Sequence, residues 1–467
     1  MAVNDRARAI EAALFRFDQG EFRARLAELV AIRSTSQEPS HGGELDRYLR
    51  EGLAPWLSAM GFAVAIHANP APGLGPILVA HRHEGDGLPR VLFYGHGDTV
   101  RGLDEQWSAG LSPWRLTERN GLWYGRGTAD NKGQHALGLA ALEAVIEARR
   151  GRLGFNLTAL IETAEELGSG GLRDFVASHR EALAADVLIG SDGPRVSPDE
   201  PTIACGSRGS FHFDLVIRRR AGAVHSGHWG GIARDPAVEL AHVLVSICDR
   251  NGRIQVRDWL PRAIPPAVTA ALVGCPVDGG DEAAAIDPEW GEPGLTPAEK
   301  IYAWTGFIVL AVVAGKPDAP LNALTPEARA HCQLRHTVDV DPARFVPSLR
   351  AHLDAAGFRD VAIENAGVRM AASRTDPAHP WVRFAAASLA ATLGRPPRIL
   401  PNASGGLPGD VFVEELGTPL VWIPHSYNGC RQHGPDEHAD PRLLREGMAA
   451  MAGLWWDIGE GGTPSAG

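Results

Sequence analysis

Strand-like and helix-like segments alternate along the first part of the chain. Short apolar runs with the length of strands occur in five places: 62–66, 77–80, 91–94, 155–161 and 187–189. Segments with apolar residues at helical spacing lie before and between them: 6–33, 44–60, the run after Lys132 and 171–179. This alternation predicts an α/β sheet with helices on both faces. The pattern returns near the end of the chain, with a strand over 420–423 and a helix over 441–456.

The middle of the chain follows a different pattern. Residues 211–218, FHFDLVIR, alternate between apolar and polar side chains, as a half-buried strand does. A helix, two strands, a second helix and a last strand follow: 236–249, 307–313, 328–338, 342–356 and 360–365. The order β-α-β-β-α-β predicts a ferredoxin-like α+β sandwich. We therefore expect residues 206–368 to form a domain inserted into an α/β domain made of residues 1–205 and 369–467.

Length, composition and charge limit the classes of protein that remain. The chain has 467 residues, of which 44% are hydrophobic and 22% charged, enough for two or three domains with well-filled cores. The net charge of −11 argues against a nucleic-acid partner, because phosphate binding needs a basic surface. The N-terminal residues lack the apolar run of a signal peptide, and no window reaches the ~18–20 apolar residues of a membrane span. We therefore expect a soluble, cytoplasmic protein with no membrane partner.

The cysteines limit the kind of metal site that the chain can build. There are five of them, an odd number, and no two have C-x-x-C spacing. This argues against a disulfide framework and against a cysteine-type zinc site. Any metal ion must therefore be held by histidine and carboxylate side chains.

Two motifs place candidate ligands beside predicted elements. In VLFYGHGDTV a buried strand ends, Gly95 permits a turn, and His96 and Asp98 follow at the edge where open α/β sheets bind ligands. Asp98 can accept the second N–H of the imidazole, although a solvated pair is the alternative explanation. In YGRGTADNKG, Asp130 precedes the helix that begins near Lys132, so it is either a helix cap or a carboxylate that bridges two cations.

Three later motifs add further carboxylates and a histidine. In ETAEELGS a strand ends shortly before Glu165 and Glu166. These two acids either begin the next helix or have different roles, one as a metal ligand and the other as a free base. In VLIGSDG another apolar strand ends before Asp192. After the strand at 420–423, we select His433, followed by GPDE, as the ligand among the nearby histidines.

These motifs together predict a metal centre, although each alone has an ordinary structural explanation. Four strand ends and one helix start bring the candidates to one region of the sheet: His96, Glu165, Glu166, Asp192, His433 and Asp130. The two histidines and three of these four carboxylates suit a pair of divalent ions, with zinc expected first and cobalt or manganese as alternatives.

The order of the motifs GHGDTV, GRGTADNKG, ETAEELGS, SDG and QHGPDE resembles that of the M20 metallopeptidases. The resemblance extends from residue 91 to residue 438. The stretch from Tyr94 through Trp107 and Trp114 to GLWYGRG is most similar to the carnosinase-like dipeptidase branch. The resemblance implies a zinc-exopeptidase-type catalytic domain and assigns the inserted domain to a lid that also forms a homodimer.

The resemblance also implies roles for residues of the metal centre. It gives five ligands for two metal ions, one held by His96 and Asp192, the other by Glu166 and His433, with Asp130 bridging both. Asp98 would orient His96, and Glu165 would be the general base and later the acid that protonates the leaving amine. The implied reaction is metal-assisted hydrolysis of an amide bond next to a free carboxylate.

Further residues match family positions near the substrate. VHSGHWGG resembles a motif whose histidine, here His225, crosses the dimer and stabilises the oxyanion in the partner's active site. Arg335 in LRHTV matches a lid arginine that meets the substrate carboxylate, and an ordinary strand-end arginine is the alternative. Asn322 matches an asparagine near the substrate. Gly405 and Gly406 match a glycine pair whose backbone N–H groups approach the substrate carboxylate.

Three departures from the family pattern bear on the substrate and leave the five ligands intact. Asn131 stands where many relatives have an acid, Asp436 where asparagine is common, and Leu407 where serine or isoleucine is usual. We expect a small peptide as the substrate, with deacylation of an N-acyl amino acid as the alternative. A non-catalytic binding homologue is a third possibility, and the intact ligand set argues against it.

Overall fold

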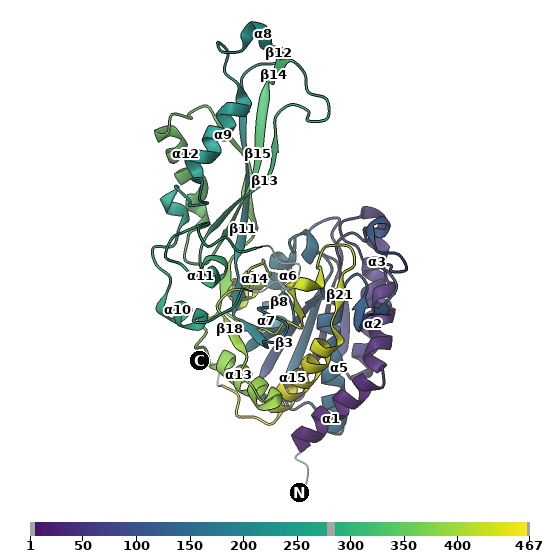
Figure 1. Cartoon of the computed structure of the whole chain (residues 1–467). Coiled ribbons are helices and arrows are strands. Elements are labelled where there is room, and N and C mark those ends of the chain that lie inside the picture. The colour runs from purple at the N-terminus through teal and green to yellow at the C-terminus, as the bar shows by residue number, and fades with distance from the viewer. Residues whose placement is uncertain (1–4, 278–284, 465–467) are drawn as a thin grey trace.

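The computed structural model describes residues 5–277 and 285–464 and has two parts (Figure 1). A larger α/β domain, the main domain, contains the first and last helices, and a narrower lid domain extends away from it. Among the described residues, no helix is both long and apolar enough to cross a membrane.

The main domain is built on an eight-stranded sheet. Its strands are, in order across the sheet, β1 (Ala63–His67), β2 (Ile77–Arg82), β6 (Asn156–Glu162), β3 (Arg90–His96), β7 (Val187–Gly190), β19 (Leu420–Trp422), β9 (Thr202–Ala204) and β18 (Arg398–Leu400). The four central strands β6, β3, β7 and β19 run parallel, so their carboxyl ends share one edge. That edge is where a doubly covered α/β sheet binds ligands.

Both faces of this sheet are buried, which explains why its strands read as continuous apolar runs. In β3, Val91 and Phe93 face one hydrophobic core, while Leu92 and Tyr94 face the other. One core is closed by α1 (Asp5–Asp18), α2 (Glu21–Ala31), α5 (Lys132–Ala148), α13 (Pro380–Leu393) and α15 (Pro441–Gly459). The other is closed by α6 (Leu172–Ser178), α14 (Gly409–Leu416), α10 (Pro266–Leu272) and α11 (Pro297–Tyr302).

The lid domain contains a four-stranded antiparallel sheet. Its strands are, in order, β13 (Gly306–Val313), β15 (Glu327–His336), β11 (Gly209–Arg218) and β16 (Ala362–Met370). Helices α9 (Pro236–Ile247) and α12 (Phe345–Ala355) cover one face. In β15 the residues alternate strictly: Leu334 and its even-numbered neighbours are buried under the helices, and Arg335 and Gln333 lie on the open face. The predicted ferredoxin-like arrangement, and with it the α/β fold class, is confirmed.

The junction between the domains is a short two-stranded pair, β10 (Gly206–Ser207) with β17 (Ser373–Arg374). Residues between the lid strands do not all stay in the lid. Val268 of α10 and Tyr302 of α11 belong to the second core of the main domain, beside Leu400 of β18. The segment that carries these two helices therefore returns to the main domain before β13 begins.

Shorter elements complete the described chain. The helices are α3 (Gly42–Arg47), a π-helical turn over Tyr48–Leu53, α4 (Ala54–Ala59), α7 (Arg180–Leu183) and α8 (Ser226–Trp229). The strands are β4 (Thr117–Arg119), β5 (Leu122–Tyr124), β8 (Pro194–Arg195), β12 (Val224–His225), β14 (Ala323–Leu324), β20 (Ser426–Tyr427) and β21 (His438–Ala439).

Candidate metal centre

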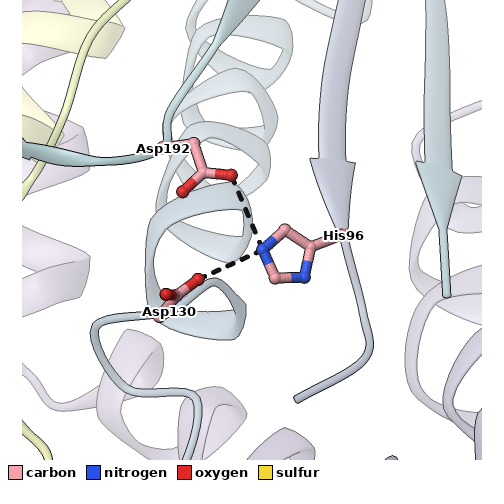
Figure 2. A group of neighbouring side chains, drawn as sticks. All are labelled: His96, Asp130 and Asp192. Atoms are coloured by element: carbon pink, nitrogen blue, oxygen red, sulfur yellow. Dashed lines mark hydrogen bonds and ion pairs between the residues drawn. The ribbon is translucent and has the colours of Figure 1, made fainter. Parts of the chain in front are cut away.

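The first ligand group gathers around His96, the last residue of β3. Its Nε2 lies 3.1 Å from Asp130 Oδ1 and 3.5 Å from Asp192 Oδ2, and Figure 2 shows both carboxylates turned toward this nitrogen. The flanking glycines make room for this position, because a Cβ on Gly95 would meet the His135 side chain at 2.5 Å. Three separate segments thus converge on one buried point at the carboxyl edge of the sheet.

The second ligand group shares Asp130 with the first. His433 Nε2 lies 3.1 Å from Asp130 Oδ2 and 3.2 Å from Glu166 Oε2. The two oxygens of Asp130 therefore face two different histidines, His96 and His433. This is the arrangement expected of a carboxylate that bridges two cations. The backbone at His433 has a φ of 65°, in the left-handed region that non-glycine residues rarely adopt.

The donor set fits divalent metal ions. In a tetrahedral zinc site, metal–ligand distances of about 2.0–2.1 Å put the ligand atoms about 3.3 Å apart. The distances of 3.1, 3.5, 3.1 and 3.2 Å within the two groups agree with this spacing. Glu166 Oε1 and Asp192 Oδ2 are buried without a hydrogen-bond partner. Buried carboxylate oxygens without a proton donor are costly, and a cation bound by each carboxylate would reduce that cost.

The electrostatics of the site indicate the same deficit of positive charge. Burial, reinforced by Asp130 although opposed by His96, raises the pKa of Asp192 to about 6. Burial and the neighbouring Asp130 raise the pKa of Glu166 to about 7. Hydrogen bonds with Asp130 and Glu166 raise the pKa of His433 to about 11. Protons therefore take the place of cations in this cluster, and metal ions would displace them.

Asp98 and Glu165 lie beside the ligands. The Asp98 carboxylate accepts the backbone N–H groups of Glu165 at 3.2 Å and Glu166 at 3.1 Å. Asp98 Oδ1 also lies 3.3 Å from His96 Nδ1, which lies 3.1 Å from the Asp98 carbonyl oxygen as well. Asp98 thus ties His96 to the turn that carries the two glutamates. Glu165 Oε2 is 3.9 Å from His96 Nε2 and belongs to neither ligand group.

Glu437 is a buried acid that the sequence reasoning missed. Its carboxylate accepts the backbone N–H groups of Gly127, Ala129 and Asp130, at 2.9 to 3.1 Å. It also accepts the guanidinium of Arg126 at 2.8 Å. Glu437 therefore holds the loop from which Asp130 reaches the two histidines. The run His-Gly-Pro-Asp-Glu was visible in the sequence, but nothing in its spacing showed that the last acid folds back onto the Asp130 loop.

A cavity of about 440 Å³ opens over the metal centre. Four acids of the centre line it: Asp130, Glu165, Glu166 and Asp192. Arg335, Gly405 and Gly406, which the sequence placed near the substrate, line the same cavity. Arg369 and Leu407 line it too, and the sequence analysis assigned no binding role to either.

His225 and Asn322 lie elsewhere. Both are exposed at the tip of the lid, where β12 pairs with β14 and α8 follows (Figure 1). The Ser226 N–H donates to the Asn322 carbonyl oxygen at 2.9 Å, which joins the two segments. Neither residue lines the cavity of its own chain.

The fold and the two ligand groups that share Asp130 define the class of protein, an α/β metallohydrolase with an inserted lid. The family model for peptidase family M20/M25/M40 matches residues 92–457. The chain therefore belongs to this family, as its motifs predicted, and is an M20-type metallohydrolase.

Individual relatives and solved structures are similar to the chain over most or about half of its length. It is 27% identical to the cysteinylglycine-S-conjugate dipeptidase of Corynebacterium striatum over 449 residues, 91% of this chain and 93% of the relative. It is 32% identical to the β-Ala-His dipeptidase of Homo sapiens over 259 residues, 53% of this chain and 50% of the relative. The fold matches human carnosine dipeptidase 1 with a TM-score of 0.80 at 21% identity, covering 97% of this chain and 99% of that structure.

Proposed function

We propose that this protein is a dipeptidase that hydrolyses the amide bond next to the free carboxylate of its substrate. The observation that carries the proposal is one cavity lined both by acids of the two ligand groups and by Arg335 of the lid strand β15. An amide carbonyl can lie beside the acids while a carboxylate meets the arginine. The dipeptidases of Corynebacterium striatum and Homo sapiens, to which the chain is similar, support this choice.

Two divalent ions, when bound by His96, Asp130, Asp192, Glu166 and His433, would activate a water molecule for attack on the scissile carbonyl. We assign to Glu165 the role of accepting the proton of that water; in support, its carboxylate lines the cavity and belongs to neither ligand group. Burial raises the pKa of Glu165 well above its usual range. A raised pKa suits a group that takes a proton and then gives it to the leaving amine.

Arg335 is proposed to bind the substrate α-carboxylate, with help from the backbone of Gly405 and Gly406. Arg335 makes no ion pair with any described residue, and burial lowers the pKa of its guanidinium. A half-buried cation without an acidic partner is stabilised by a ligand carboxylate, with which guanidinium forms two parallel hydrogen bonds.

We also propose a homodimer that forms through the lid. The edge strand β13 exposes apolar side chains in a row: Ile308, Val309, Leu310, Val312 and Val313. An exposed, apolar edge strand is a surface for pairing with another chain. The tip with His225 extends from this same domain, so a partner subunit can supply His225 to a cavity that the chain's own His225 does not reach.

One assay tests the proposed function. The purified protein is reloaded with zinc, cobalt or manganese and incubated with Ala-Gly, Ala-Gln, N-acetylglutamine and N-succinylglutamine, with and without a chelator. Release of amine from the dipeptides that the chelator abolishes is the expected result. Release only from the N-acyl amino acids would make the protein a deacylase. No release from any substrate by protein with bound metal would contradict the proposal.

A further inference from the structure

Arg369 enters the cavity because of an irregularity in the lid sheet. In the pairing of β11 with β16, Ser210 lies opposite Met370, but the next residue, Phe211, lies opposite Val368. Arg369 is therefore the extra residue of a β-bulge. Bulges redirect a side chain that regular pairing would turn to the opposite face, and they are found next to active sites.

This bulge brings a second arginine to the open face of the lid sheet. On the other side of β11, Ser210 pairs with Arg335, so both arginines flank the same end of one strand. Both line the cavity over the metal centre. His212 lies on β11, between the two arginines' strands. Burial, and then the nearby cations Arg369 and Arg335, lower the pKa of His212.

Neither arginine has an acidic partner among the residues that the structure describes. Within residues 5–277 and 285–464, no ion pair or side-chain hydrogen bond forms at Arg335 or Arg369. Every acid that lines the cavity belongs to the metal centre: Asp130, Glu165, Glu166 and Asp192. Arg208 is a third, buried arginine near Arg335, and its side chain donates to the Ser404 carbonyl oxygen without an ion pair to any described residue. The lid side of the cavity therefore carries more positive charge than one α-carboxylate neutralises.

We propose that Arg369 selects substrates with a second carboxylate, so that the preferred dipeptides end in glutamate or aspartate. The proposal rests on the proposed function, in which Arg335 takes the α-carboxylate. The second carboxylate belongs on the C-terminal residue of the substrate for a geometric reason. In the proposed function the scissile carbonyl lies beside the acids of the main domain, whereas both arginines belong to lid strands, β15 and β16. The residue after the scissile bond is thus the part of the substrate that faces them.

The test compares dipeptides that differ only in charge. The substrates are Ala-Glu and its neutral isostere Ala-Gln, with Glu-Ala and Gln-Ala as the same pair on the acyl side. For the zinc-loaded protein, kcat/KM for Ala-Glu should exceed that for Ala-Gln by about tenfold or more, the effect of a hydrogen bond to a charged group. The preference should lie mainly in KM, because binding of this carboxylate is the same in the ground state and the transition state.

Two variants test whether Arg369, at the bulge, causes the preference for Ala-Glu over Ala-Gln. Arg369→Gln should bring the Ala-Glu to Ala-Gln ratio close to one. Arg359→Gln is the matched control, because Arg359 is an exposed lid arginine that does not line the cavity, and it should keep the wild-type ratio. The ratio of the unaltered protein is measured without any variant, so the inference can be tested even if Arg369→Gln does not fold.

The outcomes separate this inference from the proposed function. Hydrolysis of Ala-Gln at a rate equal to or above that of Ala-Glu would overturn the inference and leave the dipeptidase standing. A preference that survives Arg369→Gln, or one that appears for Glu-Ala over Gln-Ala, would also overturn it. Failure to hydrolyse any of the four dipeptides would remove the proposed function and the inference with it.

Discussion

Glu165 differs from the other acids of the metal centre because it belongs to neither ligand group. Glu165→Gln keeps the shape of the side chain and removes its ability to accept a proton. We expect kcat to fall about 10²–10⁴-fold, the usual contribution of a general base, with metal content unchanged. Steady-state kinetics and metal analysis of the same preparation check this result. Glu105→Gln, at an exposed position, is the control, and near-normal turnover by Glu165→Gln would remove Glu165 as the base.

The buried side chain of Glu162, the last residue of β6, should make the stability of the protein depend on pH. This effect can be measured without an activity assay. Tyr94 and Ser169 each donate to Glu162 Oε1 at 2.8 Å, while Oε2 is buried without a partner. Burial, reinforced by Asp98, raises the pKa of Glu162 to about 7. A carboxyl group with a raised pKa contributes its full stability below its unfolded pKa of about 4.3, and this contribution is lost as the pH rises through 7.

Glu162→Gln should therefore stabilise the metal-free protein at pH 8 and have little effect at pH 4.5. The upper limit of the gain at pH 8 is roughly 4 kcal/mol, from the shift of the Glu162 pKa from about 4.3 to about 7 at 1.36 kcal/mol per unit. Urea unfolding of both proteins in chelator at the two pH values measures the difference. An equal effect at both pH values would show that packing, and not ionisation, decides the stability at this position.

Glu437 holds the loop that carries Asp130, so a change at Glu437 should alter the metal affinity of the protein. Glu437→Gln replaces an acceptor for three backbone N–H groups by an amide, which can accept through only one of its two atoms. We expect metal affinity to fall about 10- to 100-fold, as for other groups that orient ligands. Competition with a chromophoric chelator measures it. The control is Glu289→Gln, at an exposed position. Unchanged affinity would show that the Asp130 loop holds its position without Glu437.

At the scale of elements, apolar patterns predicted most of the fold. Long periodic segments such as α5 and α15, and buried runs such as β3, carry their own signal. The strands β9 (TIA) and β18 (RIL) were not predicted, because each begins with a polar residue and has only two apolar ones, whereas β19, equally short, is apolar throughout (LVW).

The candidate site likewise contains residues that the sequence could predict and residues that it could not. Candidate ligands that follow a strand or open a helix, such as His96 and Asp130, could be predicted, because strand ends in a parallel sheet meet at one edge. The position of Arg369 in the cavity could not, since it depends on a bulge that appears only when β16 pairs with β11. Glu437 could not either, because its partners lie more than 300 residues earlier in the chain.

At the scale of the whole molecule, a single chain leaves its cavity without His225, which lies at the lid tip. The proposed homodimer through β13 makes His225 active only if each lid tip enters the other subunit's cavity. His225→Ala should then lower kcat by about 10²–10³-fold, the range for loss of an oxyanion donor.

Leu310→Asp, which places a charge on the exposed edge strand, should lower activity in parallel with dissociation to monomers, measured by sedimentation.

Mixing variants separates action within one chain from action across the dimer. His225→Ala subunits retain Glu165, and Glu165→Gln subunits retain His225. A mixed dimer would contain one cavity with both groups, and random exchange would make half of the dimers mixed. The mixture should therefore recover about a quarter of the wild-type activity, because an isologous dimer has two equivalent sites and only one is complete. Each variant alone, taken through the same exchange, is the control. Recovery no greater than the sum of the two variants, with exchange confirmed by mass spectrometry, would place any effect of His225 within its own subunit.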